Sequence, residues 1–552
     1  MAHSPWNQPH QKKGSPAAAM AHGYFSFLAR SFPVMCSSDE FHFMPRAEEA
    51  ENWLDRLDDL SPEAVEGTCD ALRSFQADFK RFPRDSDLET AIDLEMLSAS
   101  CSGLLIELEQ HCSWKNNPLL YLKIVFLGLD QALKTPCPEP GEQADRIRGR
   151  LSQAARLLGQ ACMNLETMPA SQHAAALNMI EDGRAWLRAA AGPESLKKPL
   201  MSTRDLDRLD QSLHTFTDFL QGQPAVPDSD MARDTLESTL RDHFLDSRTL
   251  QEIEELADQE AASALNRLRE LQALTAPSQT WQELYHALDL PEAGTGDAFT
   301  LYSREIGHLQ NFFSESIFGV DPGEGPLELV RTPLYLNRVR SSASFCAALT
   351  RGETSFFFLS PDLPDRSGSR NDLQRSQRLN REFHFLTAHE TIPGHHLLDT
   401  RRRGLTNPVR RQLESPLFYE GWATYAETLL LERGYLQGRN HEFLEEKRRL
   451  WRAARCLIDL RRHSGAYDRD GAARLLVQSG FSRHEAFGQV DRFQLNPGYQ
   501  ICYTAGLLEL QRLRRSWGPS LGEDRFHELV LNLGEIPFDR LEDCLRRAAE
   551  TP

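Results

Sequence analysis

The segment FLTAHETIPGHH, from Phe385 to His396, contains the residue types of a metal site. In metallopeptidases two histidines on one helix bind zinc as neutral imidazoles, and the glutamate after the first histidine is the general base. Here His389 and Glu390 supply the first pair, but His395 and His396 follow His389 by six and seven residues instead of four. On a regular helix His395 would point roughly 120° away from His389, and His396 would lie about 10 Å further along the axis. Either the site is not a zinc site or the helix is not regular.

Pro393 and Gly394 give a reason to expect an irregular helix. Proline lacks an N–H group and its ring clashes with the carbonyl four residues earlier, here that of His389, while glycine adopts conformations closed to other residues. A bulge at this point would bring His395 back beside His389. Taken alone, the segment fits a solvated helix face as well as it fits a metal site.

A downstream helix, FYEGWATYAE at residues 418–427, places Glu420, Thr424 and Glu427 on one face of an apolar and aromatic segment. A carboxylate in such surroundings is costly unless it is paired or bound to a metal. Two histidines and one glutamate, with a fourth position left for water, form a catalytic zinc set. Glu427, two turns along, is suited to a hydrogen bond with a ligand histidine, and its alternative is an ordinary exposed glutamate.

Three motifs taken together resemble the bacterial domain-of-unknown-function family 885. They are H-E-x-x-P-G-H-H from His389, E-G-W-A-x-Y-x-E from Glu420, and R-F-x-x-x-P-G-x-x-x-x-Y-x-x-G from Arg492. The resemblance extends over residues 241–547, and it implies a zinc metallopeptidase of the gluzincin type. The family commonly has glutamine at the positions of Leu398 and Tyr499, so the hydrogen bonds around those positions are expected to differ here.

The same resemblance implies a role for each residue of the motifs. His389, His395 and Glu420 would bind one zinc ion per chain, and Glu390 would be the general base. The residues expected behind these ligands, off the metal, are His396 and Glu427.

An oxyanion donor and a peptide-binding strand complete the expected site. Tyr503 follows a Pro-Gly pair at a helix start and resembles the tyrosine of related helical peptidases, and His463 is the second candidate for the donor. Phe357 and Phe358 lie in the strand-like run TSFFFLS, which we expect to be an edge strand that accepts an extended peptide. The alternative for this run is a buried core strand.

The elements that position these residues are mainly helices. Apolar residues recur at intervals of three and four, as in the stripe from Leu250 to Leu271, for which Ser247 is a candidate N-cap. Persuasive strand signals lie only between residues 330 and 360. The fold class is therefore mainly α, and the family resemblance implies a two-lobed zincin-like fold with a deep cleft and a small sheet. We expect a disordered tail at 1–22, a helical half at 23–295 and a catalytic half at 296–552, with one continuous domain as the alternative.

The amino-acid composition limits the classes of molecule that we expect the protein to bind. With 62 Lys and Arg against 80 Asp and Glu, the net charge is −18, which argues against nucleic acid or an anionic membrane as the main partner. The ten cysteines include no C-x-x-C pair, and the N-terminal residues lack the apolar run of a signal peptide. We expect a cytoplasmic protein, and the sequence does not indicate its oligomeric state.

The interpretation that needs the fewest coincidences is a zinc-dependent hydrolase of peptide bonds in short peptides. One alternative is a zinc-dependent hydrolase of a non-peptide amide, and another is a helical binding protein with a vestigial metal site. The retention of Glu390 beside three candidate ligands favours an enzyme, because a degenerate site is expected to lose its base first. The sequence does not identify the cleaved end of the peptide or the arginine that binds its carboxylate.

Overall fold

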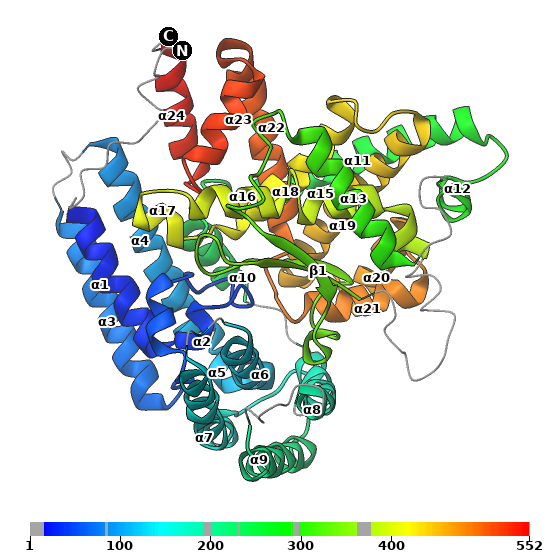
Figure 1. Ribbon diagram of the computed structural model, residues 1–552. Helices are drawn as coiled ribbons and strands as arrows, with labels where there is room; N and C mark the ends of the chain where they lie inside the picture. Colours follow the sequence, from blue (N-terminus) through cyan, green and yellow to red (C-terminus); the bar gives the residue numbers. More distant parts are fainter. Residues whose placement is uncertain are drawn as a thin grey trace.

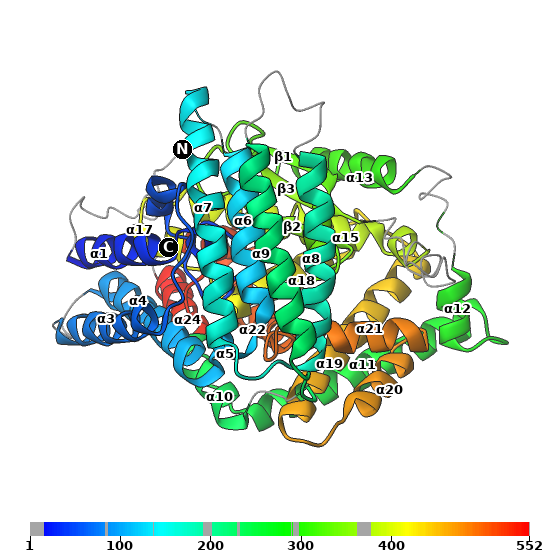
Figure 2. The same ribbon diagram turned by 90° about the horizontal axis from the view of Figure 1, so that it is seen from below.

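The computed structural model describes residues 16–82, 87–135, 137, 139–190, 201–228, 232–288, 290, 297–360 and 377–550. The fold is mainly helical with one small sheet, which confirms the predicted fold class (Figure 1). In that view the sheet lies near the centre, with α15, α16 and α18 above it and α6 to α9 below it. Seen from below in Figure 2, the helices α6, α7, α8 and α9 lie side by side.

The described helices of the first half are α1 (Pro16–Ser31), α2 (Pro33–Cys36), α3 (Pro62–Arg81), α4 (Leu88–Leu105), α5 (Ser113–Asn116), α6 (Pro118–Lys134), α7 (Pro140–Asn164), α8 (Ala170–Ala190), α9 (Thr203–Gly222), α10 (Arg233–Ser238), α11 (Leu250–Thr275) and α12 (Trp281–Ala287). Those of the second half are α13 (Ala298–Phe313), α15 (Phe383–Glu390), α16 (His395–Arg403), α17 (Pro408–Gln412), α18 (Pro416–Glu432), α19 (Arg439–His463), α20 (Arg469–Gln478), α21 (Arg483–Phe493), α22 (Ile501–Leu521), α23 (Glu523–Asn532) and α24 (Phe538–Glu550).

The N-terminal prediction was wrong over residues 16–22. These residues begin α1, and the side chains of Ala17 and Ala21 are fully buried in the hydrophobic core. The apolar spacing of this segment is helical, and burial of one helix face outweighs its small-residue composition. Residues 1–15 lie outside the described part of the chain.

The N-cap residue of α11 lies two residues later in the chain than the predicted one. Thr249, not Ser247, is the N-cap residue, because its hydroxyl accepts from the amide of Glu252 and the Glu252 carboxylate accepts from the amide of Thr249. This reciprocal capping box satisfies two amides at the helix start.

The sheet contains β1 (Leu327–Arg331), β2 (Ala343–Cys346) and β3 (Ser355–Leu359), in the order β1-β3-β2. β1 is parallel to β3, and β2 is antiparallel to it. The prediction of an edge strand at Phe357 and Phe358 was therefore wrong. β3 is the central strand and both side chains are buried, because a continuous apolar run packs best where both faces of a strand are covered.

One hydrophobic core cluster extends from Ala17 to Ala548 and includes residues on both sides of position 295. The helix α11 from the first half packs along α19 from the second. These contacts hold the C-terminal helices of the site against the N-terminal half.

Candidate metal centre

The first motif is divided between two helices. α15 ends at Glu390 and α16 begins at His395, and residues 391–394 between them are not helical. A β-carbon at Gly394 would lie 2.0 Å from the carbonyl oxygen of His389, so only glycine permits this close approach. The break places the imidazole rings of His389 and His395 with their centres 4.7 Å apart.

The second and third motifs fix this arrangement. The indole N–H of Trp422 on α18 donates to the carbonyl of Pro393, at 2.9 Å, inside the break between the helices. On the same helix, a β-carbon at Gly421 would lie 2.6 Å from the Cα of Gly506 on α22. Glycines at both positions therefore allow the two helix backbones to touch, which brings the third motif to the site.

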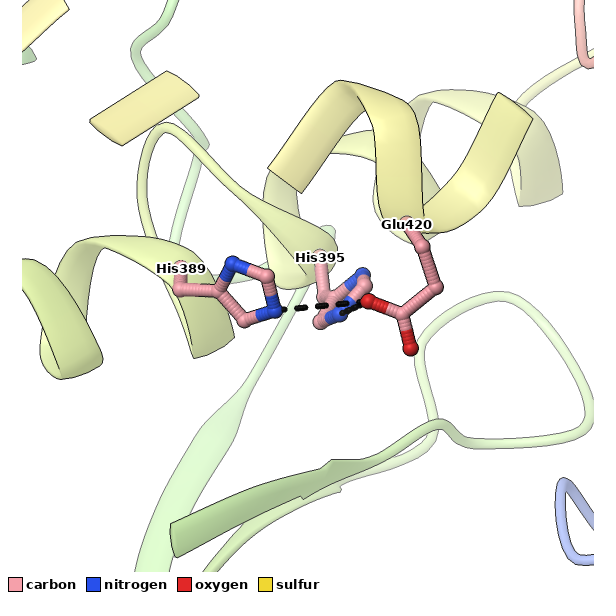
Figure 3. Close-up of side chains that lie close together, drawn as sticks. All are labelled: His389, His395 and Glu420. Atoms are coloured by element: carbon pink, nitrogen blue, oxygen red, sulfur yellow. Dashed lines mark ion pairs between the residues drawn. The ribbon is translucent and has the colours of Figure 1, made fainter. Parts of the chain in front are cut away.

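Three side chains converge on one point from these helices (Figure 3). The Nε2 atoms of His389 and His395 lie 3.5 Å and 3.6 Å from Oε2 of Glu420, and one ligand atom from each residue lies within 4.8 Å of the others. All three residues are buried. Zinc–ligand bonds of about 2.1 Å in a tetrahedral site separate the ligand atoms by roughly 3.4 Å, so the two nitrogen–oxygen distances fit a zinc ion.

The Nδ1 atom of His389 lies between two charged groups. Oε1 of Glu427 is 2.9 Å away and Nη2 of Arg452 is 3.3 Å away. In the tautomer that donates its Nδ1 proton to Glu427, Nε2 is unprotonated and its lone pair faces Oε2 of Glu420, a buried atom with no hydrogen-bond donor in the described part of the chain. Two lone pairs facing each other repel unless a cation lies between them, so in this tautomer the residues fit a bound metal ion.

The second oxygen of Glu420 has its own partner. The hydroxyl of Tyr499 donates to Oε1 at 2.7 Å, and the ring of Tyr499 stacks on His42 from the N-terminal half at 4.2 Å. The hydrogen bond from Tyr499 stabilises the ionised form of Glu420, an anion that can bind a metal.

Glu427 lies behind His389 and is held by two arginines of α19. Arg448 donates to both oxygens of Glu427, and Arg452 contacts the same two oxygens. Arg448 also pairs with the buried Glu382 at 2.6 Å, as does Lys447. This chain of buried, paired charges fixes the Glu427 carboxylate and with it the orientation of the His389 ring.

Glu390 lies beside the triad but is not one of its three converging ligands. Its Oε2 accepts from the main-chain amide of Phe345 on β2 at 2.7 Å. Burial, the largest influence, raises the pKa of the Glu390 carboxyl to about 7. A carboxyl with a pKa in this range both accepts and releases a proton near neutral pH, as general acid–base catalysis requires.

A cavity of about 240 Å³ opens onto His389, Glu390, His395 and Glu420. Tyr503 lines this cavity, and its ring lies 6.3 Å from that of His389. Burial raises the pKa of its hydroxyl, so Tyr503 is a protonated donor at neutral pH. The edge strand beside the cavity is β2, not the strand of Phe357 and Phe358. Residues 343–345 of β2 line the cavity wall together with residues 341–342, which precede the strand.

His463 and His396 both lie outside the converging triad. His463 is in the last turn of α19, where its Nδ1 faces the carbonyl of Asp459, and it does not line the cavity. Its candidacy as an oxyanion donor was therefore wrong, because the length of α19 carries it beyond Arg455. His396 is buried with Nε2 2.9 Å from the carbonyl of Gly325, so it is oriented by the backbone and not by a ligand residue.

Sequence reasoning assigned no role to several contributors to the site. Among them are Tyr499, Tyr419, whose ring stacks on His395 at 3.9 Å, and the amide of Phe345. Tyr499 stood in the third motif and could have been suspected from its position. The other two act through contacts between distant segments, which spacing along the chain does not reveal.

The sequence profile of a family described as bacterial protein of unknown function (DUF885) matches residues 47–545. No curated protein matches the chain. Two solved structures have the same fold at 16% sequence identity. One is titled "a putative lipoprotein of unknown function" from Shewanella oneidensis, with a TM-score of 0.72 over 97% of this chain and 100% of that one. The other is "the putative lipoprotein" from Colwellia psychrerythraea, with a TM-score of 0.73 over 97% and 99%. Within the described residues, no helix is both long and apolar enough to cross a membrane.

Proposed function

The chain belongs to the bacterial family of unknown function DUF885, and we propose that it is a zinc-dependent hydrolase of peptide bonds that acts on short peptides. The observation that carries this proposal is the buried triad, in which Nε2 of His389 and of His395 both face an oxygen of Glu420 that lacks a donor among the described residues. Two imidazoles and one carboxylate are the donor set of many catalytic zinc sites.

His389, His395 and Glu420 would hold the ion. A zinc ion bound there would supply a Lewis acid that polarises the scissile carbonyl and lowers the pKa of the attacking water. Glu390, fixed by the Phe345 amide, takes the proton of that water and delivers it to the leaving amine. Tyr503 donates a hydrogen bond to the oxygen on which negative charge develops.

The edge strand β2 supports a peptide as the substrate. The amide of Ser360 donates to the carbonyl of Ser342, which sets the pairing of the two strands so that the main-chain amides of Ala343 and Phe345 face away from β3. One of these amides holds Glu390, and the other is available to pair with an extended peptide. A second cavity of about 370 Å³ shares His42, Lys123 and Tyr499 with the first and provides room for residues on the other side of the scissile bond.

The test compares three proteins: the wild type, Glu390→Gln and Glu328→Gln. Glu328 is exposed on β1, away from the triad, and is the matched control. We expect the wild type to contain one zinc per chain, to cleave members of a short-peptide pool and to lose activity with a chelator. Glu390→Gln should keep zinc and fold but lose activity by a factor on the order of 10² or more, since the amide cannot accept the proton. A fully active Glu390→Gln enzyme, or cleavage by zinc-free protein, would contradict the proposal.

A further inference from the structure

Among the basic side chains on the cavity wall, Arg455 has no carboxylate partner in the described part of the chain. The basic side chains that line the cavity and have such a partner are Lys123 and Arg340 (both to Glu40), Arg378 (to Glu485), Arg448 (to Glu382 and Glu427) and Arg452 (to Glu427). Arg455 differs from these. Within the described part of the chain, no carboxylate oxygen lies within 4.0 Å of its guanidinium.

The neighbours of Arg455 hold its side chain in place without neutralising it. Its Nε and Nη2 donate to the amide oxygen of Gln500, at 3.0 Å and 2.6 Å. The guanidinium carbon lies 3.9 Å from the ring centre of Tyr503 and 5.1 Å from that of Trp451. Aromatic faces and a neutral amide orient a guanidinium, but they leave its charge available. An arginine has five N–H donors, so two bonds to Gln500 leave three for a ligand.

Arg455 lies close to the candidate metal site. Tyr503 lies between the two, with its ring centre 3.9 Å from the Arg455 guanidinium and 6.3 Å from the ring of His389. These two steps limit the separation between Arg455 and His389 to about 10 Å. An extended peptide advances roughly 3.3–3.6 Å per residue, so one or two residues fit between a carbonyl at the metal site and a group bound by Arg455.

We propose that Arg455 binds the free C-terminal carboxylate of the substrate, one or two residues after the scissile bond. A guanidinium matches a carboxylate through two parallel hydrogen bonds, and the rings of Tyr503 and Trp451 shield this pair from water. The chain would then remove one or two residues from the C-terminus of short peptides. This inference rests on the proposed function and names the end of the peptide at which the same site acts.

The experiment uses two peptides that differ only in a C-terminal carboxylate or carboxamide. For the zinc-loaded wild type we expect kcat/KM to be higher for the free acid by roughly 10- to 100-fold, the value of a charged hydrogen-bonded pair. Arg455→Gln should lower kcat/KM for the acid by that factor, mainly through KM, and so remove the preference for the acid over the amide. Arg455→Lys should restore part of the preference. Arg439→Gln, at an exposed position at the start of the same helix, is the control.

Binding without turnover gives an independent readout. Calorimetry of the same two peptides with Glu390→Gln, and with the double variant that adds Arg455→Gln, should show the preference for the acid in the first protein only. Equal losses for the acid and the amide in Arg455→Gln would make Arg455 a structural residue and overturn the inference. A preference for acidic side chains without a preference for the free C-terminus would overturn it as well.

The failure of this inference differs from the failure of the proposed function. A zinc-loaded wild type that cleaves both peptides equally well would refute the role of Arg455 and leave the peptidase proposal standing. A wild type that holds no zinc and cleaves neither peptide would refute both.

Discussion

Two helices of equal length, α6 and α18, differ in what they bury. Each has 17 residues, each begins with proline after a polar N-cap residue, Asn117 or Ser415, and each is buried on nearly every side. The buried residues of α6 are almost all apolar, and they pack against α7 and α8. By local structure and burial alone the two helices are equivalent.

The helices α6 and α18 differ in the charged side chains that they bury. α6 buries one carboxylate, Asp130, which accepts from the hydroxyl of Tyr335 at 3.0 Å and pairs with Lys134 one turn later. α18 buries Glu420 and Glu427, and one oxygen of Glu420 has no donor in the described part of the chain. A buried charge without full partners destabilises a fold. α18 therefore buries a carboxylate, that of Glu420, which its packing does not require. This additional buried charge, more than burial itself, identifies a candidate site.

The largest effect on stability is expected in α6. Phe126 is fully buried, stacks on Tyr335 at 5.6 Å and fills the space above Gly183, where a β-carbon would lie 2.1 Å from the ring. Phe126→Ala should lower the free energy of unfolding by about 3–5 kcal/mol, because a cavity remains. Urea denaturation measures this loss, and zinc bound per folded chain should not change. A Phe126→Ala protein that loses zinc while its free energy of unfolding stays unchanged would contradict the structural role of α6.

A smaller loss of stability, with a loss of metal, is expected in α18. Glu427→Gln removes the charge that pairs with Arg448 and Arg452, and it leaves one acceptor oxygen instead of two to orient His389. We expect a destabilisation on the order of 3 kcal/mol, since buried cations lose their partner, and a 10- to 100-fold weaker zinc affinity. Asp130→Asn is the matched change in α6, and it should leave zinc affinity unaltered. Equal zinc affinities in the two variants would contradict the account.

The smallest predicted difference concerns a glycine in each helix. A β-carbon at Gly421 of α18 meets the backbone of Gly506 at 2.6 Å, whereas one at Gly128 of α6 meets a methyl of Leu57 at 2.7 Å. Gly421→Ala should destabilise by roughly 1–3 kcal/mol, because a backbone cannot yield as a side chain does. Gly128→Ala should be close to neutral, since the Leu57 side chain can shift and alanine favours the helix by about 1 kcal/mol. Thermal unfolding of both variants checks this order, and a costlier Gly128→Ala would contradict it.

Local sequence patterns predicted the helical class and the small sheet, but not how the strands pair. The run containing Phe357 and Phe358 is apolar at successive positions. This pattern is typical of a strand covered on both faces, so it favoured a central strand. Strand order is decided by contacts between segments far apart in the chain. For this reason the edge position of β2, beside Glu390, could not be derived from spacing.

The sequence also predicted the candidate metal ligands better than it predicted the residues that surround them. The break at Pro393 and Gly394 could be anticipated from the chemistry of those two residues, and Glu420 could be singled out as a carboxylate on an apolar and aromatic helix. The stacking of Tyr419 on His395 depends on how separate helices pack. The same is true of Arg455, which has no carboxylate partner in the described part of the chain. The metal itself and the activity remain predictions.

The central claim is that His389, His395 and Glu420 bind zinc, and two adjacent histidines test it most directly. His395 and His396 are both buried, yet Nε2 of His395 faces Glu420 while Nε2 of His396 faces the carbonyl of Gly325. The measurement is the zinc bound per chain in folded His395→Ala and His396→Ala proteins, after dialysis against trace zinc. We predict that His395→Ala is empty and that His396→Ala retains one zinc. A zinc-replete His395→Ala protein, or an empty but folded His396→Ala protein, would contradict the account.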